Sequence, residues 1–79
     1  MVRVKEKTIE EYIERLQRHL LKRYPDLQFE VVKWSDTEAA VYYRPYAEQE
    51  DFAIIHRAST VTTDALVDCG FSIHVGPAD

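Results

Sequence analysis

The chain has 79 residues, of which 46% are hydrophobic and 30% are charged, and its formal net charge is −4 at pH 7. This length and composition predict one small soluble globular domain and exclude a disordered chain. No apolar stretch approaches the ~20 residues that cross a bilayer, and the first residues lack the apolar run of a signal peptide, so we expect a cytoplasmic protein without membrane contact. The acidic balance disfavours nucleic acid as a partner, because phosphate binding needs a surplus of Lys and Arg on one surface.

Residues 1–7 alternate charged side chains with two valines. They offer little apolar surface, which predicts an N-terminal tail, with a short edge strand as the open alternative. Residues 8–79 contain no repeat, low-complexity segment or linker, and we expect them to form a single α+β domain.

The first predicted helix spans residues 8–24. Thr8 and Glu11 have the spacing of a capping box, in which each side chain accepts a hydrogen bond from a free backbone N–H at the helix start. Pro25 disfavours helical geometry at Tyr24 and so ends the helix. The residues expected on its buried face recur three or four apart: Ile9, Tyr12, Ile13, Leu16, Leu20 and Tyr24.

Two alternating segments, 27–34 and 38–44, predict a β-hairpin around a three-residue loop. Pairing Trp34 with Glu38 sets the other pairs on that side: Val32 with Ala40, Glu30 with Tyr42, and Gln28 with Arg44. The opposite side is the expected core side and carries Phe29, Val31, Val41 and Tyr43. Pro45 cannot donate to a strand ladder and ends the hairpin.

A second helix is predicted to end at Gly70, which suits the left-handed conformation that stops a helix. Its expected core face is Ile55, Ala58, Thr62, Ala65, Leu66 and Cys69, with Phe52 at the entry. The β-branched run at 60–63 weakens this prediction, and the alternative is a strand at 52–58 followed by a shorter helix. Residues 71–77 alternate as a last strand.

The order helix, strand, strand, helix, strand predicts a two-layer αββαβ sandwich, with a three-stranded mixed sheet and both helices on one face. The alternative is a ferredoxin-like βαββαβ arrangement with residues 2–6 as an extra strand in the middle of the sheet. The basic residues of that segment fit a buried central strand poorly.

The predicted sheet leaves one face uncovered, and this face is the first candidate site. Its candidate interface residues are Trp34, Tyr42, Arg44, Val32, Glu30 and His74. Trp, Tyr and Arg are enriched at binding hot spots, which favours a non-enzymatic protein-interaction or regulatory domain that forms a homo-oligomer, most simply a homodimer, through this face or a sheet edge. On this hypothesis Trp34→Ala or Tyr42→Glu disrupts association. The alternatives are that Trp34 folds over its own core, or that the face stacks a planar ligand.

Catalytic residues have little support, because the known glycine-rich, hydrolase, zincin and kinase motifs are missing from the sequence. His56, Arg57 and Cys69 are weak ligand or catalytic candidates, and an enzyme or ligand-binding subunit with its site at a dimer cleft is the alternative function. We expect no metal and no cofactor, because His56 and Cys69 are too far apart for one ligand pair. A lone cysteine at a helix end predicts a small buried hydrophobic side chain.

Basic residues gather in the first predicted helix: Arg15, Arg18, Lys22 and Arg23. They are expected to wrap around the helix as a solvated surface, partly paired with nearby glutamates. The alternative is an anionic partner on this helix, as in an accessory nucleic-acid-binding domain.

Overall fold

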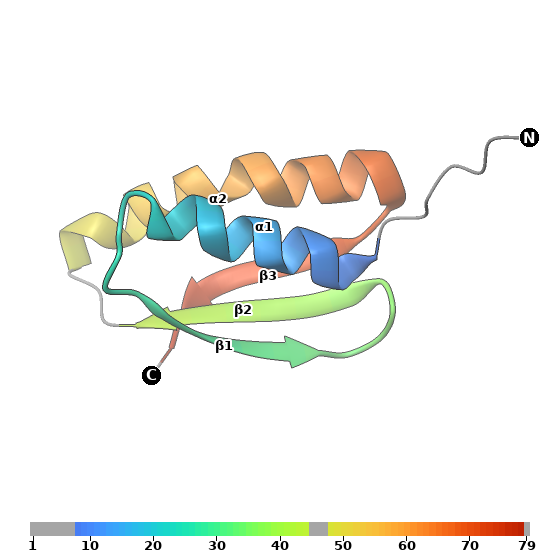
Figure 1. Cartoon of the computed structure of the whole chain (residues 1–79), viewed down its shortest axis with the longest axis horizontal. Helices are drawn as coiled ribbons and strands as arrows, with labels where there is room; N and C mark the ends of the chain where they lie inside the picture. The colour runs from blue at the N-terminus through green and yellow to red at the C-terminus, as the bar shows by residue number, and fades with distance from the viewer. Residues whose placement is uncertain (1–7, 45–47, 79) are drawn as a thin grey trace, which may run out of the picture.

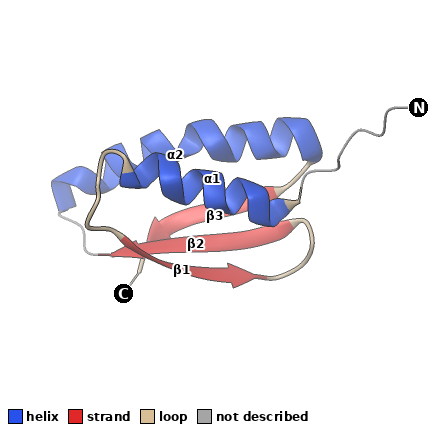
Figure 2. Ribbon diagram, in the orientation of Figure 1, coloured by secondary structure: helices blue, strands red, loops and turns tan. Residues whose placement is uncertain are grey.

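The computed structural model describes residues 8–44 and 48–78, with only the backbone of 48–51. The elements in chain order are α1 (Ile9–Leu21), β1 (Gln28–Lys33), β2 (Glu38–Arg44), α2 (Glu48–Cys69) and β3 (Ser72–Pro77). Both helices lie on one face of a three-stranded mixed sheet, as Figure 1 and Figure 2 show. The predicted two-layer αββαβ architecture is confirmed. None of the described helices is long and apolar enough to cross a membrane.

Helix α1 begins with the predicted capping box. The Thr8 side chain accepts from the Glu11 N–H, and the Glu11 carboxylate accepts from the Thr8 N–H at 3.0 Å. Five apolar side chains of α1 are buried: Ile9, Tyr12, Ile13, Leu16 and Leu20. The helix ends at Leu21, three residues before the predicted end, and Tyr24 lies beyond it with its ring packed against the core.

The β1–β2 hairpin has the predicted register. Val32 lies opposite Ala40, Glu30 opposite Tyr42, and Gln28 opposite Arg44. The N–H of Trp34 donates to the carbonyl of Glu38 at 2.9 Å and closes the hairpin end.

Strand β3 pairs directly with β2 in the parallel direction, with Ala40 opposite His74 and Tyr42 opposite Gly76. This pairing leaves no place for a strand between β2 and β3, so the ferredoxin-like alternative is wrong. The segment 2–6 that it invoked lies outside the described residues.

Helix α2 is continuous through Ser59–Thr63, and the alternative of a strand at 52–58 is therefore wrong. It ends where Gly70 takes a φ of 73° and donates its N–H to Leu66 at 2.9 Å. The next residue, Phe71, turns into the core, where its ring meets Tyr12 edge-on with 5.8 Å between centroids.

The buried face of α2 differs from the prediction. The side chains that enter the core are Ile54, Ala58, Val61 and Ala65. Of the predicted face only Ala58 and Ala65 are buried; Ile55, Leu66, Cys69 and the entry residue Phe52 are exposed, and Thr62 is half-buried. The helix carries two overlapping apolar stripes of the same spacing, and spacing alone did not identify the one that the sheet covers.

Candidate interaction surfaces

The open sheet face holds the residues predicted for it, but it is neither continuous nor strongly apolar. Val32 and Tyr42 are half-buried, His74 is exposed, and Ala40 is fully buried between its neighbours. An Nη atom of Arg44 lies 3.2 Å from a carboxylate oxygen of Glu30, which pairs the two charges on this face.

Trp34 and Arg44 lie at opposite ends of this face. The register separates Trp34 from Arg44 by three pairs on the same side of the hairpin, which corresponds to roughly 20 Å at the rise of a strand. The Trp34 side chain is 59% exposed beside the hairpin loop. The six candidate residues therefore follow the hairpin and β3 as a strip, with Trp34 at one end and Arg44 at the other.

A second surface lies on the flank of α2 above the outer edge of β3. Leu66 is 57% exposed and Ile55 is 38% exposed, and spacings of four and seven residues put both on the same flank as Thr62. We define the β3 margin as five residues of these two elements: Ile55, Thr62, Leu66, Ile73 and Val75.

The contacts of α2 show which way this flank faces. Arg57 and Asp64 contact α1, through the His19 carbonyl at 3.1 Å and the Arg15 guanidinium at 2.7 Å. Thr62 and Leu66 lie on the other flank, where they line a hollow of about 150 Å³ together with residues 71–73. The β3 margin therefore faces away from α1, beyond the edge of the sheet.

The backbone of β3 has hydrogen-bonding groups on this outer edge. The N–H groups of Ser72 and Ala78 donate to β2-side carbonyls, each at 2.8 Å. Alternate residues of a strand direct their N–H and C=O groups to the same side. Ile73 and Val75 therefore direct theirs outward, where no described strand pairs with them.

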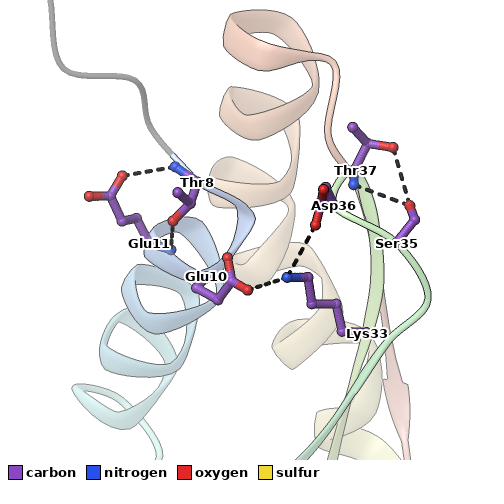
Figure 3. Close-up of polar contacts among 7 residues, drawn as sticks. All are labelled: Thr8, Glu10, Glu11, Lys33, Ser35, Asp36 and Thr37. Atoms are coloured by element: carbon purple, nitrogen blue, oxygen red, sulfur yellow. Dashed lines mark hydrogen bonds and ion pairs between the residues drawn. The ribbon is translucent and has the colours of Figure 1, made fainter.

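The other sheet edge, β1, carries charged side chains, although the apolar Val31 is also 42% exposed there. Lys33 contacts the carboxylate of Glu10 on α1 and lies 3.5 Å from Asp36 in the hairpin loop, as Figure 3 shows. The hydrogen bond to Lys33 holds the pKa of Glu10 below its usual value. Charged side chains on an edge strand oppose pairing with another chain. Strand β3 contains no charged residue, so the two edges differ in their readiness to pair.

No family model, curated protein or solved structure matches the chain. Its function therefore has to be inferred from the residues themselves.

The weak ligand or catalytic candidates do not gather in one place. His56 is exposed and stacks on Phe52, with 6.2 Å between ring centroids, whereas Cys69 lies thirteen residues further along the helix, about 20 Å at the helical rise. Arg57 is half-buried and donates to a carbonyl. Within 8–44 and 48–78, no group of three or more His, Cys, Asp and Glu side chains could hold a metal ion.

Cys69 is exposed, and the prediction that it would be buried is wrong. Its sulfur lies 3.7 Å from the Tyr12 hydroxyl, which is also 3.4 Å from an Asp68 oxygen. The contact with Cys69 and the burial of the ring raise the pKa of Tyr12 to about 12. Cys69 lies on the same flank of α2 as Leu66, and the burial of the other apolar stripe leaves this flank, with the thiol, outside the core.

The sequence predicts Ile55 and Leu66 as core residues, whereas the structure exposes both. The signal that could have placed them outside is the second stripe Ile54, Ala58, Val61 and Ala65, which has the spacing of a core face and contains no polar side chain.

Proposed function

We propose that this domain is a non-enzymatic protein-interaction module that forms a homodimer through the β3 margin. The observation that carries the proposal is the coincidence of two features at one place. The outward N–H and C=O groups of Ile73 and Val75 lie on the edge strand of the sheet. The exposed Leu66 lines one hollow with Ile73, and the exposed Ile55 belongs to the same flank of α2 as Leu66. An unpaired strand edge is a template for another strand, and an apolar overhang stabilises the partner that covers it.

A second copy of the chain fits this margin because the margin complements itself. Two β3 strands related by a two-fold axis run antiparallel, so each copy supplies N–H groups opposite the carbonyls of the other. No charged side chain of β3 meets its own equivalent across the axis. Pro77, which has no N–H to donate, lies at the end of the strand and limits the length of the ladder.

The helices extend the same contact into the second layer. Pairing at β3 brings the α2 flanks of the two copies together above the joined sheets, so that Leu66 and Ile55 become buried against the partner's α2. The hollow of about 150 Å³ beside Leu66 gives an inserted side chain a place in the interface. Apolar contacts of this kind supply the affinity that backbone hydrogen bonds alone give only weakly.

The test is the absolute mass in solution by light scattering, measured over a wide range of protein concentration. We expect a mass that rises to twice the 9.3 kDa of the chain. A mass of one chain at every concentration would overturn the proposal. The mass of one chain would also be observed if another segment of the same chain, or an unrelated partner, occupied the β3 margin.

Two variants distinguish a dimer interface at the β3 margin from one at the open sheet face. The sequence-based hypothesis expects Trp34→Ala and Tyr42→Glu to disrupt association, whereas a dimer built on the β3 margin leaves both side chains outside the interface. We therefore expect both variants to dimerise as the parent does. Loss of the dimer in these variants would move the interface to the open face.

A further inference from the structure

A basic groove lies between α1 and α2, on the opposite flank of α2 from the β3 margin. It has a volume of about 410 Å³ and is lined by Arg15, Arg18, His19, Lys22, Thr60 and Val61. Arg15 and Arg18 of α1 and the C-cap residue Lys22 are spaced by three and four residues, so they form one stripe. The prediction that the basic residues wrap around the helix is therefore wrong for these three, and Arg23 lies outside the groove.

The positive charge of this groove is only partly neutralised. Asp64 binds Arg15 at 2.7 Å, and Glu14 lies 3.6 Å from Arg18 on the exposed surface of α1. In the part of the chain that the structure describes, no carboxylate pairs with Lys22, and the Arg57 guanidinium donates to a carbonyl rather than to an acid. The three cations that line the groove and the neighbouring Arg57 are therefore offset by only the two carboxylates named here.

His19 reports the resulting potential. Burial lowers the pKa of this imidazole, and the positive charges of Arg57, Lys22 and Arg15 lower it further. The groups that face it are Arg15, Arg18 and Lys22 on its own helix and Arg57 on α2, with Asp64 and Glu14 as the described acids nearby. Burial is the larger cause of the lowered pKa, and the repulsion by Arg57, Lys22 and Arg15 adds to it, as expected where the potential is positive.

We propose that this groove binds a small molecule through a phosphate group, most favourably a diphosphate. Guanidinium groups bind phosphate oxygens through pairs of N–H donors, the Lys22 ammonium supplies a further charge, and the Thr60 hydroxyl can donate from α2. The volume falls in the range of small-molecule sites. Among the described residues that line the groove there is no Phe, Tyr or Trp, which disfavours stacking of a nucleic-acid base and so favours a small phosphate-bearing ligand over a single strand.

The test is a titration of the full chain with inorganic pyrophosphate at low ionic strength, and NMR spectra of the chain detect the binding. Saturable shifts are expected at the amides of Arg15, His19, Lys22 and Thr60. Bound pyrophosphate is expected to raise the pKa of His19 toward its ordinary value. The amide signals of His56 and His74, which lie outside the groove, are expected not to shift.

Lys22→Ala and Arg23→Ala form a matched pair, because the two residues are adjacent, exposed and equally charged, and only Lys22 lines the groove. Lys22→Ala is expected to weaken binding about fivefold or more, since one charge-assisted hydrogen bond is lost, and Arg23→Ala to change it less than about twofold.

Three results would overturn the proposal: no saturable shift up to millimolar pyrophosphate, equal weakening in both variants, or binding of a single-stranded oligonucleotide without binding of pyrophosphate. This site is independent of dimer formation, so the mass measured by light scattering does not bear on it.

Discussion

Replacing Leu66 with aspartate is expected to raise the dissociation constant of the homodimer at least ~100-fold while the monomer stays folded. The side chain is more than half exposed in the single chain, so the monomer loses little packing. In a two-fold dimer the substitution acts twice: each copy loses about 1 kcal/mol of apolar burial, and each places a carboxylate in a contact that excludes water.

The matched control is Val67→Asp. Val67 is adjacent to Leu66 and is 76% exposed, so the same charge enters the same turn of α2. Leu has the higher helix propensity, so Leu66→Asp loses a few tenths of a kcal/mol more of it, which is small beside the expected effect on the dimer. It lies outside the β3 margin, and we expect the dimer to persist. Analytical ultracentrifugation gives both dissociation constants, and circular dichroism verifies the fold. Equal dissociation constants for the two variants would contradict the interface; Ile55→Asp is the second variant if Leu66→Asp fails to fold.

Leu16→Ala is expected to lower the free energy of unfolding by about 2–5 kcal/mol. Leu16 has no exposed surface, and it lies in the centre of the α1 face that packs on the sheet and α2. A domain of 79 residues has only about 4–12 kcal/mol of stability in total, so the loss is a large share of it. The midpoint of thermal unfolding should fall by about 10 °C or more.

Val67→Ala is the control for this loss, because it removes apolar atoms from an exposed site on α2. Its effect on the free energy of unfolding is expected to stay within about 0.5 kcal/mol. Urea unfolding at a protein concentration below that of dimer formation gives both values without a contribution from association. A Leu16→Ala variant as stable as the control would mean that α1 is not part of the core.

Most of the architecture could be predicted because the helix-capping and turn residues and the alternation of apolar residues in the strands indicated the same elements. The Thr8–Glu11 capping box fixed the start of α1, and the pairing of Trp34 with Glu38 fixed the hairpin register. Once the register was known, the position of α2 between β2 and β3 implied a parallel pair, and β2 and β3 are parallel.

The spacing of apolar residues in α2 did not identify its buried face. Ile54 and Ile55 are adjacent, and each begins an apolar stripe with helical spacing. The stripe from Ile54, which contains no polar side chain, is the one that the sheet covers. Which stripe is buried matters for the proposed function, because the residues of the exposed stripe form the helical part of the β3 margin. The exposure of Cys69 follows from the same rotation of the helix.

The basic groove shows a second limit of prediction from the sequence, because two helices form it together. The sequence predicts that the basic residues wrap around the helix, whereas Arg15, Arg18 and Lys22 line one groove. The groove exists because Thr60 and Val61 of α2 form its second wall. A contact between helices about forty residues apart in sequence leaves no periodic signal within either helix.

Amide hydrogen exchange along β3, measured by NMR at several protein concentrations, tests the homodimer most directly. The N–H groups of Ile73 and Val75 point away from β2, beyond the edge of the sheet, whereas those of Ser72 and Ala78 donate hydrogen bonds on the β2 side. The dimer predicts that protection of Ile73 and Val75 increases with protein concentration, while Ser72 and Ala78 change little. Protection of Ile73 and Val75 that is absent, or that does not depend on concentration, would contradict pairing with a second copy.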